Sequence, residues 1–363
     1  MAQTMTAAGA APRTEGGSRR AVADPVLLAG LETALLSGRF PAVLLATGPR
    51  GVGLRALLLD IAQALICPQA EGLNACGRCP DCRQLKSGHS RMLWLLPNVS
   101  EETAAKIDSY GPERILQDPW TAPAPPASSQ IPVGGDSTTP TYPLMTAGVR
   151  GLASRLAMSD KDVRVVMIPW AEHLNQSSSN SLLKLLEEPP PRVHFLLAAA
   201  STDSVLPTIR SRSFIQAVPP LSSERVQAFL EARGFESDAA AEAAPRCLGR
   251  PGVALRMATP EARHLRNKGR EWLQLCLGQD PEAGLRWVQE SDELSAKDQR
   301  LAIGLVDAAL GELATDLLTT TDRPRLERLD LLRASLERTR ADIAGHCKPS
   351  MAFTSCLLAV HLE

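Results

Sequence analysis

One stretch of this sequence constrains the fold more than any other. A short apolar run at 42–46, bounded by Pro41 and Gly48, predicts a buried strand. The turn that follows, at 48–53, contains three glycines, and residues 54–66 then continue as a predicted helix. Strand, glycine-rich turn and helix in this order are typical of the opening of a parallel α/β unit.

The rest of the first two thirds of the chain continues this alternation. Further strands are predicted at 92–96, 163–168 and 194–199, and helices at 25–37, 146–158 and 176–188. Strands that alternate with helices predict a parallel sheet covered on both faces. From about residue 222 only helical patterns remain: a compact unit at 222–258, then a bundle with apolar stripes such as Val306, Leu310, Leu313, Leu317 and Leu329, Leu332, Leu336.

Composition divides the chain further. Eight of its 28 prolines lie between Pro112 and Pro143, so we expect 100–144 to be a mostly unstructured insertion. Residues 1–22 are rich in Ala, Gly, Thr and Arg and are expected to form a disordered tail. The predicted domains are therefore an α/β domain at 23–218, a small helical domain at 219–260 and a helical bundle at 261–363.

Charge and hydropathy exclude several functions. The net charge is −1, which gives no overall basic field, so we do not expect this chain to bind DNA tightly alone. A local patch, or DNA contact inside a larger assembly, stays open. No apolar run approaches the roughly 20 residues that span a bilayer, and the first twenty residues lack the apolar core of a secretory signal. We therefore expect a cytoplasmic protein without membrane contact.

The glycine-rich turn occupies the place of a phosphate-binding loop but lacks its chemistry. After Gly48 and Gly53, a working loop continues with Lys, which reaches the β- and γ-phosphates, and Ser or Thr, which binds Mg²⁺. This chain has Leu54 and Arg55 there. The third strand ends in Pro-Trp at 169–170, where an active relative would carry Asp and Glu. We expect no ATP hydrolysis in this site, although backbone amides of the loop retain an affinity for anions.

Four of the eight cysteines form the pattern C-x8-C-x2-C-x2-C: Cys67, Cys76, Cys79 and Cys82. Each x2 step lets two thiolates converge on one ion, and Pro and Gly residues between them supply turns. Four sulfur ligands predict a closed, structural Zn²⁺ site. Iron–sulfur ligation and four unligated thiols are the alternatives. The other cysteines are scattered through apolar helical sequence and are interpreted as core residues.

Three segments resemble the subunits of bacterial DNA polymerase III clamp loaders, which belong to the AAA+ family of P-loop NTPase-like proteins. They are the run 37–45 that leads into the glycine loop, the run Asn-Ser-Leu-Leu-Lys-Leu-Leu-Glu-Glu-Pro-Pro at 180–190, and 206–213, which resembles the family's Ser-Arg-Cys motif with Ser213 in place of Cys. The family includes the ATP-hydrolysing gamma/tau motor and the delta-prime type. The lost Lys, Ser/Thr and acidic pair favour the delta-prime type.

The resemblance implies an AAA+ parallel-sheet domain, a small helical lid domain at 219–260 and a collar at 261–363 through which subunits oligomerise. It implies gamma/tau and delta subunits as partners, and the sliding clamp and primed DNA through the complex, in the bacterial cytoplasm. It also makes Arg212 an arginine finger that acts in trans on the motor's ATP. Arg210 is an alternative finger; without the resemblance, either side chain is interpreted as a solvated arginine.

Two acidic residues, Glu187 and Glu188, end the helix at 176–188, where the helix dipole disfavours negative charge. Such an arrangement indicates a functional surface or a solvated helix end. Two other functions remain open beside the non-hydrolysing clamp-loader subunit. One is an active ATPase motor with an unorthodox site, and the other is a zinc-dependent interaction module unrelated to replication.

Overall fold

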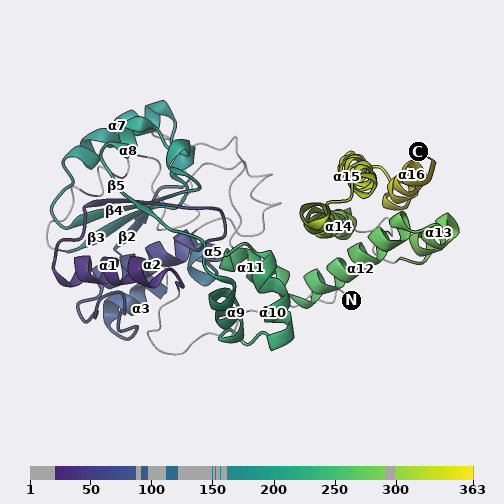
Figure 1. Cartoon of the computed structure of the whole chain (residues 1–363). Helices are drawn as coiled ribbons and strands as arrows, with labels where there is room; N and C mark the ends of the chain where they lie inside the picture. Colours follow the sequence, from purple (N-terminus) through teal and green to yellow (C-terminus); the bar gives the residue numbers. More distant parts are fainter. Residues whose placement is uncertain are drawn as a thin grey trace, which may run out of the picture. The chain divides into compact units, whose positions relative to one another are not determined.

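The computed structural model describes residues 21–86, 91–96, 112–121, 162–291 and 299–362, together with Val149, Leu152, Leu156 and Leu294. The chain divides into two compact units, Met1–Arg256 and Met257–Glu363 (Figure 1). The first contains the sheet and the second is helical.

The first unit is built on a five-stranded sheet in which all neighbouring strands are parallel. The strand order is β2-β3-β4-β1-β5. The strands are β1 (Val43–Thr47), β2 (Met92–Trp94), β3 (Arg164–Ile168), β4 (Val193–Ala199) and β5 (Phe214–Ala217). Because β1 pairs with both β4 and β5, the turn that follows it leaves from the interior of the sheet.

Helices cover both faces of this sheet, which confirms the predicted α/β class. One face carries α1 (Pro25–Leu36), α2 (Leu54–Ile66) and α3 (Pro80–Lys86), and the other carries α7 (Gln176–Glu187) and α8 (Pro207–Arg210) (Figure 1). Side chains alternate between the faces along each strand. Val43 and Leu45 of β1 therefore share one core cluster with Leu182 of α7.

The predicted strands and helices of this unit are present with shifts of a few residues. The strand that the sequence patterns missed is β5, whose Phe214 and Ile215 are 57% and 41% exposed. Strands are predicted from the alternation of apolar and polar residues along the sequence. An edge strand whose apolar residues are exposed lacks that alternation. Of the helix predicted at 146–158, only Val149, Leu152 and Leu156 are described; they are helical and belong to the core.

The prediction that 100–144 is mostly unstructured was wrong for residues 112–121. This segment forms α5 (Pro112–Gln117) and then a turn in which Asp118 Oδ1 accepts hydrogen bonds from the amides of Trp120 and Thr121, both at 3.1 Å. Ile115 and Trp120 are buried. Burial of these two apolar side chains orders the segment. The number of prolines, on which the prediction rested, gives no information about such burial. The rest of 100–144, and residues 1–20 of the tail predicted at 1–22, lie outside the described residues. At the end of that predicted tail, Ala21 is buried and its amide donates to Oδ2 of Asp60 at 2.8 Å.

Three helices follow β5 within the first unit: α9 (Ser223–Glu231), α10 (Ser237–Arg246) and α11 (Pro251–Met257). Buried alanines at 239, 240, 243 and 244 let α10 approach α9 closely. The amide of Gly252 in α11 donates to the carbonyl of Gly51 at 2.8 Å. The helical region therefore contacts the glycine loop directly.

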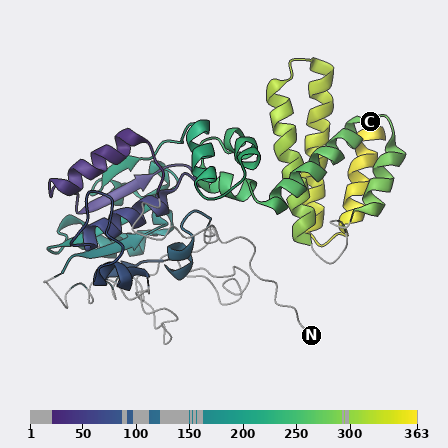
Figure 2. The same cartoon turned by 90° about the horizontal axis from the view of Figure 1, so that it is seen from below.

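The second unit is a helical bundle around one core, drawn in green to yellow in Figure 2. Trp272 packs against Trp287 and Phe353 with ring centroids 5.0 and 5.2 Å apart. The predicted stripe residues Val306, Leu313, Leu329, Leu332 and Leu336 are all buried in this core. The helices are α12 (Pro260–Leu277), α13 (Pro281–Glu290), α14 (Gln299–Thr319), α15 (Arg323–Ala344) and α16 (Pro349–Leu362).

Within the described part of the chain, no helix combines the length and the apolar character that crossing a membrane requires.

Candidate functional site

The glycine loop joins the carboxyl end of β1 to the amino end of α2, as the sequence predicted. Gly51 and Gly53 have φ values of +91° and +106°, a backbone conformation that residues with a Cβ rarely adopt. Gly53 is the residue that precedes the first turn of α2, and no side chain caps this helix end. In sheets of this kind such a loop is the usual place for a phosphate group.

The space over this loop is filled by Trp120. A Cβ added to Gly53 would lie 2.5 Å from Cζ3 of the Trp120 indole, so the ring rests directly on the glycine backbone. Trp120 itself is 3% exposed and packs against Phe229 of α9, with ring centroids 4.7 Å apart. The guanidinium of Arg233 lies 5.2 Å from the Trp120 ring centroid. A side chain of the chain itself therefore packs against the glycine loop at Gly53.

Arg55 and Trp170, which stand where an active relative would carry groups for phosphate and Mg²⁺ chemistry, contact each other. The Arg55 guanidinium stacks over the Trp170 ring at 5.4 Å, and its Nε donates to the carbonyl of Pro119 at 3.2 Å. Burial lowers the pKa of Arg55 to about 10, while the charge of Asp118 opposes this shift. Arg55 is thus still a cation at neutral pH, held by an aromatic face and a carbonyl.

The positions where a phosphate-binding loop carries its lysine and hydroxyl hold other residues in this chain. Leu54 and Arg55 begin α2 where a lysine and a hydroxyl would bind phosphate and Mg²⁺, and Trp170 stands at the end of β3. Glu172, which follows in η1 (Ala171–His173), is the nearest acid along the chain after β3. The geometry therefore fits a packed structural contact better than a catalytic pocket.

The four clustered cysteines converge as predicted. Their Sγ atoms all lie within 4.8 Å of one another. Three Sγ–Sγ distances are 3.5 Å (Cys67–Cys76), 3.9 Å (Cys67–Cys79) and 3.9 Å (Cys76–Cys82). Sulfurs that surround one Zn²⁺ at about 2.3 Å in a tetrahedron are roughly 3.8 Å apart, so these residues fit a four-sulfur metal site.

Backbone amides around the cluster add to this fit. The amides of Cys76, Cys79 and Cys82 donate to the Sγ atoms of Cys67, Cys76 and Cys79 at 3.4, 3.3 and 3.4 Å. Amide hydrogen bonds favour the thiolate form, and they are the main cause that lowers the pKa of Cys76. Burial raises the pKa of Cys82. The cluster can hold a metal ion, and no open position for a substrate is evident in a four-sulfur set.

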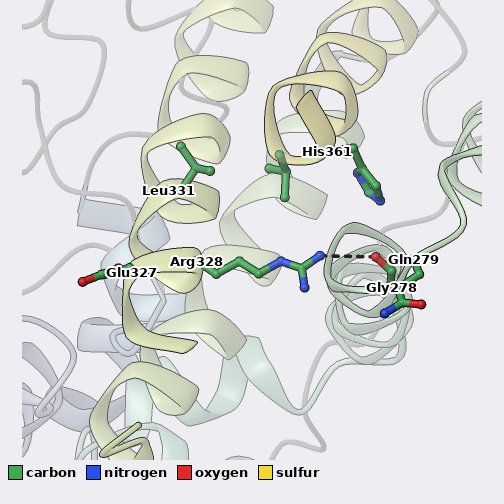
Figure 3. A pocket seen from close by; sticks show the side chains of 7 residues that line it. Gly278, Gln279, Glu327, Arg328, Leu331 and His361 are labelled. Carbon is green, nitrogen blue, oxygen red and sulfur yellow. Dashed lines mark hydrogen bonds between the residues drawn. The ribbon is translucent and has the colours of Figure 1, made fainter. Parts of the chain in front are cut away.

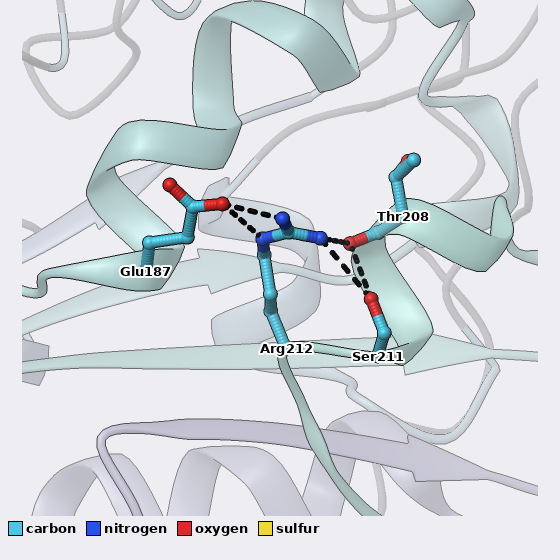
Figure 4. A network of polar contacts seen from close by, with 4 residues as sticks. All are labelled: Glu187, Thr208, Ser211 and Arg212. Atoms are coloured by element: carbon cyan, nitrogen blue, oxygen red, sulfur yellow. Dashed lines mark hydrogen bonds and ion pairs between the residues drawn. The ribbon is translucent and has the colours of Figure 1, made fainter.

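Arg212 lies in the turn between α8 and β5, on the side of the sheet that carries α7. Its Nε and Nη2 both donate to Oε1 of Glu187, the Nε bond at 2.7 Å. Its Nη1 donates to the carbonyl of Thr208 at 3.0 Å and to Oγ of Ser211 at 3.1 Å (Figure 4). The predicted finger is thus a partly exposed arginine in a network of its own chain.

The neighbours of Arg212 have separate contacts. Arg210 forms an ion pair with Asp203 at 2.9 Å. Ser213, which stands where the family motif has Cys, donates from Oγ to the carbonyl of Ile209 at 2.8 Å. The Ser213 hydroxyl therefore closes the turn without involving the Arg212 guanidinium.

A hollow of about 680 Å³ lies in the helical unit. Arg328 reaches into it and donates to the carbonyl of Gly278 at 3.3 Å (Figure 3). The hollow is lined by Gly278, Gln279, Glu327, Arg328, Leu331, Val360 and His361. None of the residues singled out from the sequence lies there.

Two residues of the site were missed or only partly predicted from the sequence. Trp120 belongs to a segment interpreted as unstructured, and an isolated tryptophan among prolines was the available signal. Glu187 was marked only because it ends a helix, and its partner Arg212 is 25 residues away. A contact across that separation depends on the fold rather than on a local pattern.

The fold and this site together define a class. A five-stranded parallel sheet with β1 and its glycine loop in the interior, followed by helices, is an AAA+ α/β domain with a helical C-terminal region. The profile of the family described as "DNA polymerase III, delta subunit" matches residues 23–222, more than half of the chain. The chain belongs to this family, which confirms the resemblance found in the sequence.

Individual relatives agree with this assignment. The chain is 30% identical to DNA polymerase III subunit delta' of Pseudomonas aeruginosa over 172 residues, 47% of this chain and 41% of the relative. It is 24% identical to the Escherichia coli K12 subunit delta' over 318 residues, 86% and 79% of the two chains. It is also 29% identical to subunit gamma/tau of Mycobacterium bovis over 51% of this chain and 25% of the relative. The chain thus spans less than half the length of the Pseudomonas relative.

Among solved structures, the chain matches the RuvB Holliday junction branch migration motor of Thermotoga maritima. That match has a TM-score of 0.38 and 16% identity, and it covers 69% of this chain and 61% of the other. A DNA polymerase III gamma subunit-related protein of the same organism has a TM-score of 0.34 and 17% identity, over 77% and 97% of the two chains.

Proposed function

We propose that this chain is a non-hydrolysing clamp-loader subunit of the delta-prime type, which helps to load a sliding clamp onto primed DNA. Its partners are gamma/tau and delta subunits, and it reaches the clamp and the DNA through the complex. Family membership and the delta' and gamma/tau relatives support this proposal.

One observation carries the non-hydrolysing part: the chain's own Trp120 packs against the glycine loop at Gly53, while Arg55 stacks on Trp170. Lysine and a hydroxyl are absent from the two positions that follow the loop, and the Trp120 indole packs against Gly53. Even with the indole removed, no ligand for Mg²⁺ would follow the loop. This combination disfavours the active-motor alternative.

In this proposal Arg212 supplies an arginine finger to the ATP site of the neighbouring motor subunit. A planar, permanently charged guanidinium stabilises the charge that develops on the γ-phosphoryl group. Arg212 is 30% exposed and stands in the turn before an exposed edge strand, so a neighbouring subunit can approach it.

The four cysteines hold a structural Zn²⁺ in this proposal. Zn²⁺ bound by Cys67, Cys76, Cys79 and Cys82 would fix the segment that runs from the end of α2 into α3. Cys67 directly follows α2, and Cys82 lies within α3. The domain assignment extends the proposal: 219–260 is the lid and 261–363 is the collar through which subunits assemble.

The experiment that tests the function is the clamp- and DNA-stimulated ATPase of motor and delta subunits with this chain added. We expect the wild-type chain to stimulate hydrolysis. The Arg212→Ala variant should assemble equally well but stimulate at least about 10³-fold less at the affected site, the lower end of measured finger effects. Arg210→Ala is the matched control, because it removes the same charge two residues away and leaves the finger in place.

Each outcome separates the alternatives. Loss of stimulation in Arg210→Ala, with Arg212→Ala active, moves the finger to Arg210. Hydrolysis by the isolated chain, which the filled loop argues against, supports the active-motor alternative. Failure of the wild-type chain to associate with either partner supports the interaction module instead.

A further inference from the structure

The contact between Glu187 and Arg212 has a geometry that goes beyond a surface ion pair. Four hydrogen bonds leave the guanidinium: two to Oε1 of Glu187, one to the Thr208 carbonyl and one to Ser211 Oγ (Figure 4). Since a guanidinium has five N–H groups, one remains for any other acceptor.

Glu187 occupies the Nε/Nη2 edge of the guanidinium. A guanidinium recognises planar or tetrahedral oxyanions through two parallel N–H groups, and the Nε/Nη2 edge presents such a pair. The two N–H groups of Nη1 point to Thr208 and Ser211, which lie in and just after α8. A phosphate oxygen that approaches Arg212 therefore competes with the Glu187 carboxylate for the same edge.

The position of Glu187 is unfavourable for the helix that carries it. Glu187 is the last residue of α7, where the carbonyl end of the helix disfavours an anion. A lysine there would suit α7 better, so helix stability does not account for a carboxylate. Its pairing with Arg212, which lies in the turn between α8 and β5, does account for it.

The pair is also exchangeable. The side chains of Glu187 and Arg212 are 48% and 30% exposed, so solvent screens their attraction. Exposed pairs contribute little to stability, and a doubly charged phosphate is the stronger partner for a guanidinium. The contact can therefore hold Arg212 in the isolated chain and still give way to an anion in an assembled site.

We propose that Glu187 is a positioning residue for Arg212, which it holds in place of the γ-phosphate until the neighbouring subunit's ATP displaces it. This inference rests on the proposed function of Arg212 as a finger acting in trans. The Thr208 carbonyl and Ser211 hydroxyl keep the guanidinium oriented when the carboxylate leaves, so release of Glu187 frees the Nε/Nη2 edge for an anion.

The test uses the complete complex of motor, delta and this chain, with ATP varied. Glu187→Gln keeps the size of the side chain and removes its charge. In this variant the carboxylate no longer competes with the nucleotide for the Arg212 guanidinium, in either the ground state or the transition state. We therefore expect KM for ATP to fall about two- to five-fold, with kcat little changed. This range corresponds to the strength of exposed ion pairs. Glu188→Gln is the matched control: it is the adjacent acid, and we expect no change in KM.

Arg212→Ala and the double variant Glu187→Gln/Arg212→Ala complete a cycle. The effect of Glu187→Gln must disappear when Arg212 is absent. If Arg212→Ala behaves as the wild type, Arg212 is not the finger and the role of Glu187 fails with it. If Arg212→Ala loses stimulation while Glu187→Gln leaves KM unchanged or raises it, the finger stands and the role of Glu187 is overturned. A KM change that persists in the double variant also overturns it, because it acts through something other than Arg212.

A second measurement addresses the contact in the isolated chain. Phenylglyoxal modifies accessible guanidinium groups, and mass spectrometry of peptides locates the product. We expect Arg212 to react several-fold faster in Glu187→Gln than in the wild type, with Arg210, which keeps its Asp203 partner, as the internal reference. Equal rates at Arg212 in both proteins would show that Glu187 does not hold it.

Discussion

At the scale of single residues, large side chains of the chain itself pack at and near the glycine loop. Trp120 covers the loop backbone, and Arg55 turns away from the loop to stack on Trp170. Side chains of this size bury large areas, so the closed loop is stabilised by the hydrophobic effect instead of by a ligand.

This packing predicts the effect of a single methyl group. We expect Gly53→Ala to destabilise the protein by at least about 2 kcal/mol, because the new Cβ meets the Trp120 ring and the backbone at φ +106° becomes strained. Gly30→Ala is the control: Gly30 lies within α1 with nothing within 4 Å of the added Cβ, so alanine there should stabilise by about 0.5–1 kcal/mol. Urea unfolding of both variants measures the difference, and equal stabilities would show that Trp120 does not rest on the loop.

At the scale of secondary-structure elements, close approach decides how the helical bundle packs. Gly269 lies in the middle of α12, and a Cβ there would be 2.9 Å from the backbone nitrogen of Ala309 in α14. The two helix backbones therefore meet with no side chain between them. The buried alanines 302 and 309 of α14 extend this contact.

Replacing a glycine by alanine should therefore change the free energy of unfolding in opposite directions on the two helices. Gly269→Ala is expected to destabilise the bundle by about 1–3 kcal/mol, because backbone atoms of α14 must move apart from α12. Gly311→Ala, within α14 and with nothing within 4 Å of the added Cβ, should stabilise by about 0.5–1 kcal/mol. Thermal unfolding followed by circular dichroism tests both; a stabilised Gly269→Ala variant would contradict the close packing of α12 and α14.

At the scale of the whole molecule, a small cysteine cluster lies beside a large parallel sheet. Cys67 follows α2 directly, and Cys82 lies within α3, so a bound ion would connect two helices of the α/β unit. An ion that binds only the folded chain adds its binding free energy to the free energy of unfolding. With an ion bound to these cysteines, the stability of the α/β unit would depend on metal.

Metal removal should expose this dependence. We expect purified protein to contain one zinc per chain by elemental analysis, and a chelator or Cys76→Ser to lower the free energy of unfolding by at least about 2 kcal/mol. Cys347→Ser, outside the cluster and half-buried, should leave it nearly unchanged. Iron in place of zinc, with visible absorbance, would support the iron–sulfur alternative, and full stability without any metal would refute a structural ion.

The sequence by itself determined the α/β class, the position of the glycine loop and the absence of lysine and a hydroxyl after it. It also determined which four cysteines cluster, and it singled out Arg212 within the run at 206–213. These properties depend on local order along the chain: alternation of apolar runs, glycine positions and cysteine spacing predict local structure without knowledge of distant residues. The glycine loop from Gly48 to Gly53 and the helix that follows it therefore match the prediction closely.

Only the tertiary structure decided what occupies the loop and what holds the arginine. Trp120 lies 67 positions after Gly53 and Glu187 lies 25 positions before Arg212, so neither contact has a local signature. The exposed strand β5 escaped prediction for a related reason, because its neighbour β1 supplies its hydrogen bonds while its own residues lack a buried face. Contacts between distant segments form only where the sheet brings those segments together, and packing then selects the residues that fill the space.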